Sequence, residues 1–185
     1  MQIIATAIPD VKEIKPVRRL DPRGFFSEIY RETLLREHGI DVPFVQENHS
    51  LSVDRGVVRG LHFQTPPEGQ AKLVRVAAGS ILDVAVDIRH GSPTFGRHVA
   101  IVLNASDGNQ LFVPEGFAHG FCTLEPNTEV VYKVSRYYSP KHDAGMLWND
   151  PSLDIAWPIG ESEALLSDKD RRAPRMAELP HHFRY

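Results

Sequence analysis

Two histidines and a lysine are the residues in this sequence best suited to chemistry, because glycine and proline turn signals surround them. His62 lies between Gly56 and Lys72, and His119 ends the segment Pro-Glu-Gly-Phe-Ala-His. An imidazole titrates at about pH 6.5, so it can exchange protons near neutral pH. An ammonium group can stabilise a negative oxygen that forms during a reaction. These residue types favour acid–base chemistry carried out by side chains.

The spacing of these residues resembles the two signature motifs of the cupin superfamily. The motif positions are Gly56, His62, Gln64, Lys72 and Gly79 in the first segment, and Gly108, Pro114, Glu115, Gly116 and His119 in the second. In metal-binding cupins the positions of Gln64 and Lys72 carry His and Glu. A divalent cation prefers neutral imidazoles and carboxylates, and an ammonium at the carboxylate position would repel it. The resemblance therefore implies a pocket that needs neither a metal nor another cofactor.

Composition and charge restrict the class of protein. A chain of 185 residues is long enough to bury a core, and we expect one domain over residues 1–185. The formal net charge of -3 argues against non-specific nucleic-acid binding. One cysteine, Cys122, excludes an intrachain disulfide and favours a reducing compartment such as the cytoplasm. The segment Met1–Pro9 resembles neither a signal peptide nor a membrane span.

Short β-like runs dominate the chain, which predicts an all-β sandwich or barrel. One helix is expected at Glu32–His38, and the polar, proline-broken region after Trp157-Pro158 predicts irregular structure with short helical turns. The expected strands are Phe44–Ser52, Val57–Gln64, Lys72–Ala77, Ile81–Ile88, His98–Leu103, Gln110–Val113, Gly116–Leu124 and Thr128–Tyr137.

The strand Ile81–Ile88 alternates between apolar side chains on one face and Asp83, Ala85 and Asp87 on the other. In a sheet with one solvated face, the acidic face would point to water. In a barrel whose interior is a pocket, the same face would line the site. The alternation allows both arrangements.

Several segments together resemble the dTDP-4-dehydrorhamnose 3,5-epimerase family, a metal-free branch of the cupins. The resemblance extends from about Ile3 to Asp170. It implies a double-stranded β-helix, or jelly-roll barrel, with a short N-terminal extension and short C-terminal helical turns. The matching segments are Asp21–Glu28, Gln46–Ser50, Gly56–Gln64, Lys72–Val74, Asp83–Arg89, Gly91–Gly96, Pro114–Phe121 and Trp148–Pro151.

The resemblance also implies a reaction, the epimerisation of a dTDP-linked 4-keto-6-deoxyhexose at C3 and C5. Both carbons flank a ketone, so a base can remove their protons and leave an enolate. No hydride is transferred, and the chain contains no glycine-rich dinucleotide motif. The expected product is dTDP-4-dehydro-L-rhamnose, an intermediate in dTDP-L-rhamnose biosynthesis.

The family's catalytic positions correspond to four residues of this chain. By resemblance, His62 is the general base, Asp170 holds its imidazole, Tyr132 is the proton donor and Lys72 stabilises the C4 oxygen. A phenol can fill this role if nearby cations lower its pKa. Without the motif, His62 would more often be a hydrogen-bonded core histidine and Tyr132 an ordinary strand tyrosine.

Substrate contacts are likewise implied by the resemblance. Arg23 and Arg59 suit a diphosphate, because guanidinium groups match phosphate oxygens. Other residues are expected to contact the nucleoside or the sugar. Among them, Asp83 is expected to orient His119 or Lys72, and Asp143 stands where the family usually has Glu. These residues are Phe26, Glu28, Gln46, Asn48, Asp83, His119, Tyr138, Asp143 and Lys169.

Strict alternation along Val57–Gln64 places Arg59 and His62 on opposite faces, although the resemblance requires both at the site. A bulge or bend at Gly60 would bring both side chains to one face.

The family forms homodimers, so Arg23, Phe26 and Glu28 could reach the site of a partner subunit. Three alternatives stay open at this point. The chain could epimerise only C3 or only C5, it could bind sugars without catalysis, or it could be a metal-dependent cupin enzyme. The sequence predicts no nucleic-acid partner and no membrane partner.

Overall fold

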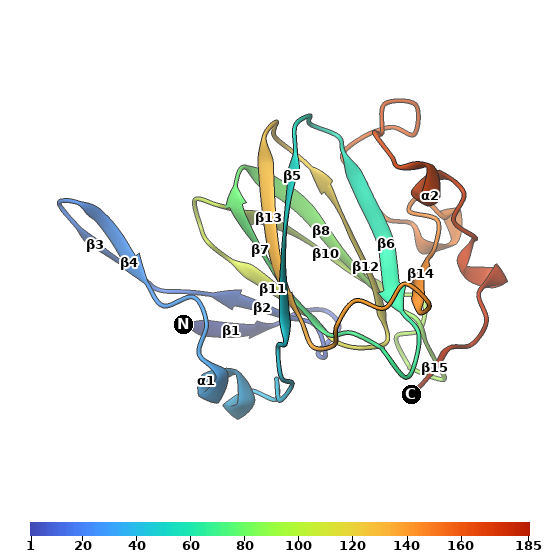
Figure 1. Cartoon of the computed structure of the whole chain (residues 1–185), viewed down its shortest axis with the longest axis horizontal. Coiled ribbons are helices and arrows are strands. Elements are labelled where there is room, and N and C mark those ends of the chain that lie inside the picture. Colours follow the sequence, from blue (N-terminus) through green and yellow to red (C-terminus); the bar gives the residue numbers. More distant parts are fainter.

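Two antiparallel β-sheets pack face to face in a jelly roll (Figure 1). The computed structural model describes all residues 1–185. This arrangement confirms the expected all-β barrel. In spatial order, the first sheet contains β1 (Gln2–Ala5), β2 (Lys12–Lys15), β11 (Gln110–Val113), β7 (Lys72–Ala78), β13 (Thr128–Val134) and β5 (Gln46–Ser52), and the second contains β10 (His98–Asn104), β8 (Ser80–Asp87), β12 (Phe117–Thr123), β6 (Val58–Gln64) and β14 (Asp143–Gly145).

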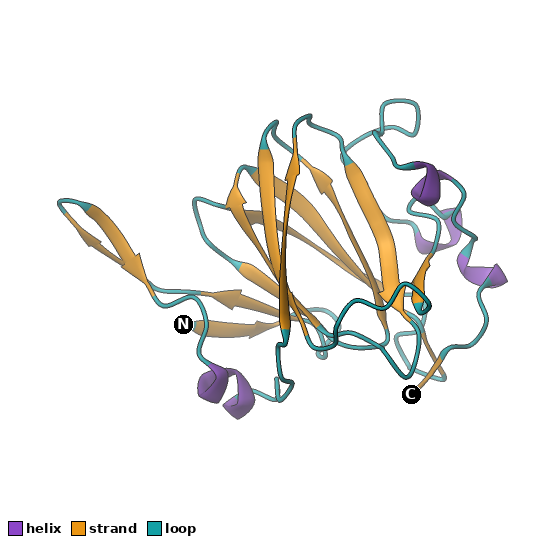
Figure 2. Cartoon of the chain, in the orientation of Figure 1, coloured by secondary structure: helices purple, strands orange, loops and turns teal.

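The remaining elements lie outside the two sheets, and the helices are confined to the periphery (Figure 2). The N-terminal extension includes a hairpin that projects away from the barrel (Figure 1). The C-terminal segment runs beside β6 and β14 (Figure 1). These elements are the hairpin β3 (Arg18–Asp21) and β4 (Gly24–Ser27), the helix α1 (Glu32–Glu37), the strands β9 (Arg89–His90) and β15 (Phe183–Arg184), and the short helices η1 (Pro151–Leu153), α2 (Asp168–Arg171) and η2 (Met176–Glu178).

All eight expected strands are present, but the last of them ends at Val134 rather than Tyr137. A side chain explains the early end. The Gln64 amide donates to the carbonyl of Tyr137 at 3.2 Å and accepts from the backbone of Ser139 at 2.7 Å. The backbone at Tyr137 and Ser139 therefore bonds to a side chain instead of a neighbouring strand.

Both faces of β8 are buried, and this decides the direction of its acidic side chains. Ala85 packs in the core between the sheets, whereas Val84 and Val86 pack under the C-terminal segment against Phe183. Asp83 therefore points into the barrel and is fully buried. Asp87 is also fully buried, but its carboxylate is bonded to Arg89, Ser92 and Thr94 and holds the turn after β8.

A bulge at Gly60 interrupts the pairing of β6 with β12. His119 pairs with His62, but Phe121 pairs with Arg59, so β6 has one more residue than its partner over this stretch. Gly60 has φ +133°, and a Cβ at this position would lie 2.5 Å from Gly120 Cα. The bulge that the sequence predicts is confirmed, and Arg59 and His62 line the same cavity.

None of the helices has the length and apolarity needed to cross a bilayer.

We expect Gly60→Ala to destabilise the fold by about 3 kcal/mol, because a side chain there combines backbone strain with overpacking. The added Cβ would meet the backbone of Gly120 and His119, which cannot move without displacing β12. Urea denaturation followed by tryptophan fluorescence measures the loss. Gly160→Ala is the matched control, since its Cβ would make an ordinary 3.6 Å contact with Glu163. Equal stability of the two variants would show that position 60 does not require glycine.

Candidate active site

A cavity with two lobes opens at the end of the barrel, and three side chains line both lobes: His62 from β6, Lys72 from β7 and Tyr132 from β13. We call the larger lobe, of about 590 Å³, the arginine lobe, because Arg59 and Arg171 line it. We call the other, of about 400 Å³, the amide lobe, because it is lined by Gln46, Asn48, Gln64 and Gln70 together with Tyr138, Asp143 and Lys169. The two sheets therefore present acid–base groups from opposite walls at the place where the lobes meet.

His62 is coupled to the C-terminal segment through Asp170. Its Nε2 lies 2.5 Å from Asp170 Oδ1, and the carboxylate is buried at the C-terminal half of α2. Burial raises the pKa of Asp170, but the hydrogen bond and charge of His62, with weaker bonds from Ser167 and Gly60, outweigh burial and lower it. An ionised Asp170 accepts the hydrogen of Nε2, which leaves the lone pair on Nδ1. This tautomer suits a base.

His119 forms a second imidazole–carboxylate pair, directly opposite His62 in the strand register. Its Nε2 lies 2.7 Å from Asp83 Oδ1, and both side chains are buried. Burial lowers the pKa of His119 more than Asp83 raises it. His119 is therefore a neutral ring that donates its Nε2 hydrogen to Asp83. The second carboxylate oxygen of Asp83 has no hydrogen-bond partner.

Lys72 carries its ammonium group inside the barrel and is only 7% exposed. Burial lowers its pKa to about 8, against the upward effects of Asp83 and Asp143, while Lys169 lowers it further. The group is thus mainly charged at neutral pH. Its single hydrogen bond within the chain is a long one, 3.4 Å to the His62 carbonyl. The ammonium therefore retains hydrogens that can be donated to an oxygen in the cavity.

Tyr132 corrects one expectation from the sequence, that nearby cations lower its pKa. Burial raises the pKa, and the opposing effects of Asn48 and Arg59 are smaller. The side chain packs against the core between the sheets, and contact with that core removes water from its hydroxyl. The phenol therefore keeps its proton at neutral pH, as a proton donor must.

The amide lobe joins five of the expected binding residues by hydrogen bonds. Gln46 donates to Asn48 at 2.8 Å and accepts from the backbone of Tyr138 at 3.0 Å. Asp143 accepts from the Tyr138 hydroxyl at 3.1 Å and from Lys169 Nζ at 2.5 Å. The lobe thus combines a flat aromatic ring with amides and one ion pair, which suits a polar ring with donors and acceptors on its edge.

Comparison with known proteins supports the resemblance seen in the sequence. The family model of dTDP-4-dehydrorhamnose 3,5-epimerase matches residues 5–178. The chain belongs to this family. A dTDP-4-dehydrorhamnose 3,5-epimerase from Sinorhizobium fredii is 48% identical over 185 residues, which cover 100% of this chain and 94% of the relative.

Solved structures of the dTDP-sugar epimerases show the same fold. The epimerase from Legionella pneumophila, in complex with dTDP-4-keto-L-rhamnose, is 43% identical with a TM-score of 0.94, over 100% of this chain and 98% of that one. A 3'-monoepimerase from Streptomyces bikiniensis, in complex with dTDP-quinovose, is 36% identical with a TM-score of 0.86, over 94% of this chain and 87% of that one.

Three of the positions carried over from the epimerase family lie away from the cavity within this chain. Arg23 sits on the projecting hairpin and pairs with Asp21 at 2.7 Å. Phe26 is 71% exposed. Glu28, just beyond the hairpin, pairs with Arg31. The hairpin points away from the barrel (Figure 1), so these residues lie apart from the cavity of this chain.

Other residues of the cavity were not expected from the sequence. Ser50, Ser167 and Arg171 line the arginine lobe, and Gln70 lines the amide lobe. For Arg171 a usable signal existed, because it follows Asp170 in the same helical turn. Gln64 is buried, and its amide bonds to three backbone groups of the neighbouring loops. It therefore supports the wall of the amide lobe.

The cavity does not have the donor set of a metal site. No group of three or more His, Cys, Asp and Glu side chains is placed to bind an ion. Gln64 is committed to backbone groups, and the buried Lys72 ammonium would repel a cation in this cavity.

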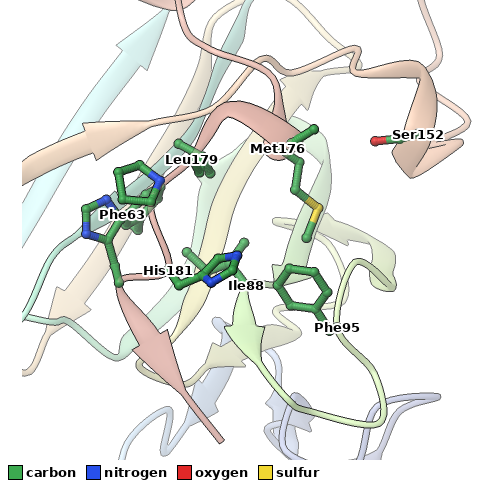
Figure 3. Close-up of a pocket in the computed structure, with 10 residues that line it drawn as sticks. Phe63, Ile88, Phe95, Ser152, Met176, Leu179 and His181 are labelled. Atoms are coloured by element: carbon green, nitrogen blue, oxygen red, sulfur yellow. The ribbon is translucent and has the colours of Figure 1, made fainter.

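A separate cavity of about 250 Å³ lies between the C-terminal segment and the outer face of the second sheet. Phe63, Ile88, Met176 and Leu179 make it mainly apolar, and His181 lies beside Ile88 (Figure 3). None of the expected site residues lines it.

We expect Lys72 to titrate near pH 8 in the folded protein, measured from lysine ¹³Cε shifts and assigned with Lys72→Met. Asp83→Asn and Asp143→Asn should each lower this pKa further, because both carboxylates favour the charged ammonium. The two variants are independent, so loss of folding in one leaves the other informative. A Lys72 midpoint near the ordinary value of 10.5 would contradict burial of the ammonium.

The lowered pKa of Lys72 also determines whether the free energy of unfolding rises or falls with pH. Between about pH 8 and 10.5 the unfolded chain holds the Lys72 proton while the folded chain has released it. The contribution of Lys72 to the free energy of unfolding therefore rises with pH through this window.

Proposed function

We propose that this chain epimerises dTDP-4-dehydro-6-deoxy-D-glucose at C3 and C5 and forms dTDP-4-dehydro-L-rhamnose, a step of dTDP-L-rhamnose biosynthesis. The observation that carries the proposal is the meeting of His62–Asp170, Lys72 and Tyr132 where the two lobes join. Membership of the dTDP-4-dehydrorhamnose 3,5-epimerase family supports it. So does the Legionella pneumophila relative, which was solved with dTDP-4-keto-L-rhamnose.

His62 begins the reaction by removing a proton from a carbon next to the C4 ketone. Nδ1 accepts this proton, and the electron pair of the C–H bond moves into an enolate whose charge lies on the C4 oxygen. Asp170 stabilises the imidazolium that results, since it already accepts the hydrogen of Nε2. The base therefore becomes stronger without any change in its position.

Lys72 stabilises the enolate oxygen with a hydrogen from its ammonium group. A donor of this kind, held where water is scarce, typically contributes about 10²–10³ in rate. The neutral ring of His119 lies next to His62 in the register and offers a second polar contact to the sugar. Asp83 holds this ring and lies close enough to raise the Lys72 pKa.

Tyr132 completes the inversion by donating its proton to the carbon from the opposite wall of the cavity. His62 and Tyr132 belong to different sheets, so they approach a sugar between them from two sides. Asn48 and Arg59 favour the phenolate that is formed. Before the second carbon reacts, Tyr132 must regain a proton and His62 must lose one, so the two protons balance.

We place the nucleoside in the amide lobe, with Tyr138 as a stacking surface and Gln46, Asn48, Asp143 and Lys169 around it. Arg59 is placed against the diphosphate, because its guanidinium bonds only to Ser52 and the Leu51 carbonyl and has no carboxylate partner. The proposal treats residues 1–185 as one domain and places the enzyme in the cytoplasm.

We also propose a homodimer in which the hairpin of one subunit completes the site of the other. The hairpin exposes large apolar side chains, with Leu20 81% and Phe25 55% exposed. Such a patch marks a surface that is covered by a partner. Arg23, Phe26 and Glu28 would then act in trans, which explains why they lie far from their own cavity.

A one-carbon epimerase is the second candidate. It is favoured by the likeness to the Streptomyces bikiniensis 3'-monoepimerase. The base and the donor would be the same in both cases, so the number of exchanged protons separates them.

Incubation with dTDP-4-keto-6-deoxyglucose in D₂O tests the reaction directly. We expect deuterium at both C3 and C5 by NMR and mass spectrometry. Exchange should fall by about 10²–10⁴ in His62→Ala, and formation of the inverted product should fall by a similar factor in Tyr132→Phe. Both variants should still bind dTDP. His49→Ala and Tyr137→Phe are matched controls, because His49 pairs with Glu129 and neither residue lines the cavity.

The outcomes separate the candidates. Deuterium at one carbon only would support the one-carbon epimerase. Binding of dTDP without any exchange would support a sugar-binding protein, and stoichiometric zinc, iron or manganese would support a metal enzyme. Near-native exchange at both carbons in His62→Ala would require a different base.

Complementation between two inactive variants tests the dimer. If the hairpin acts in trans, mixed dimers of Arg23→Ala and His62→Ala contain one fully native site. Random reassociation into two-fold dimers should restore about a quarter of the wild-type activity. Arg19→Ala is the control variant, because Arg19 lies on the same hairpin but outside the proposed contacts. Its mixture with His62→Ala gives the activity expected from simple dilution. No recovery beyond the activity of the separate variants would mean that Arg23 acts in cis or not at all.

A further inference from the structure

The short helix α2 supplies three consecutive side chains to the two lobes of the cavity. Lys169 lines the amide lobe, Asp170 bonds to His62, and Arg171 lines the arginine lobe. The turn is held by Ser167, whose hydroxyl accepts from the Asp170 backbone at 3.2 Å and whose carbonyl accepts from the Arg171 backbone at 3.1 Å. The position of Arg171 is therefore set by the same turn that positions the carboxylate of the base.

The guanidinium of Arg171 has no hydrogen-bond or ion-pair partner in the chain, whereas those of Arg31, Arg89 and Arg172 pair with a carboxylate or a carbonyl. Arg59, in the same lobe, bonds to a hydroxyl and a carbonyl but to no acid. Asp54 also lines the lobe and forms no ion pair with either arginine. Two uncompensated cations thus face one cavity.

The two arginines are also close in the fold, because their neighbours in the sequence touch. Gly60, which follows Arg59, donates its backbone hydrogen to the carboxylate of Asp170, which precedes Arg171. The segments that lead to them are joined as well, by a bridge between Val57 and Leu165. The bulge at Gly60 and the turn of α2 together bring both guanidinium groups to one lobe.

We propose that Arg171 is a second phosphate-binding residue of this chain and holds the substrate's diphosphate together with Arg59. The inference rests on the proposed function and adds to it a contact within the subunit. A diphosphate presents more oxygen acceptors than one guanidinium can satisfy, and planar guanidinium forks match phosphate oxygens in pairs. The amide lobe, by contrast, contains only one cation besides the shared Lys72, and this cation, Lys169, is already paired with Asp143.

Binding of dTDP and of thymidine to Arg171→Leu, measured by calorimetry, tests this assignment. We expect the Kd of dTDP to rise about tenfold, in line with the loss of charged hydrogen bonds at a partly exposed site. The Kd of thymidine should stay unchanged, since it lacks the diphosphate. The Kd of dTDP for Arg171→Lys should lie between those of the wild type and Arg171→Leu, because lysine keeps the positive charge but lacks the planar guanidinium fork.

Arg172→Leu is the matched control. Arg172 follows Arg171 in the sequence, but its guanidinium donates to the Asp168 carbonyl at 3.0 Å, and it lines neither lobe. Arg172→Leu should bind dTDP with the same Kd as the wild type. Raising the salt from about 50 to 500 mM should weaken dTDP binding more in the wild type than in Arg171→Leu, because screening acts on the contact that the variant lacks.

In turnover, Arg171→Leu should raise KM by a similar factor and leave kcat and its pH profile close to those of the wild type. Unchanged dTDP affinity would overturn the inference, and so would equal weakening of thymidine. A fall in kcat with an altered pH profile would also overturn it, by showing that Arg171 acts through Asp170. Failure of the wild type to bind dTDP would instead refute the proposed function.

Discussion

Burial of a charged ammonium in the barrel is the constraint on which the rest of the site depends. Removing Lys72 from water disfavours its charged form, and its pKa falls to about 8 as a result. Asp83 and Asp143 oppose this shift without cancelling it. The outcome is an ammonium that is charged at neutral pH but poorly solvated. A negative oxygen placed beside it gains more than it would in water.

The backbone must be irregular for this arrangement to include both the diphosphate contacts and the base. A regular strand would turn Arg59 away from His62, and the bulge at Gly60 prevents this at the expense of strict pairing with β12. Only glycine fits, because a Cβ would strike Gly120 and the His119 carbonyl. The C-terminal segment then supplies Asp170 from outside the barrel. The site is therefore assembled from the two sheets and from a turn that covers them.

Local alternation in the sequence was sufficient for the strands, because it acts over a few residues. The bulge at Gly60 was expected only because the family resemblance requires Arg59 and His62 at one site. Local alternation could not decide the direction of Asp83, since both faces of β8 are buried. Val84 and Val86 pack under Phe183, and no periodicity links that distant residue to the strand. The shift of the Tyr132 pKa was misjudged for a similar reason. The direction of the shift depends on burial, which raises the Tyr132 pKa by more than the charge of Arg59 lowers it.

The two imidazole–carboxylate pairs show why residue types alone cannot assign roles. His62 and His119 are neighbours in the register, and each has an aspartate at hydrogen-bond distance. Their surroundings differ, because the side chain of His62 is 33% exposed and that of His119 only 7%. A base must reach the substrate and afterwards return its proton to solvent, which His62 can do. His119 is held neutral by burial, so it serves better as a fixed polar contact beside the reacting carbons.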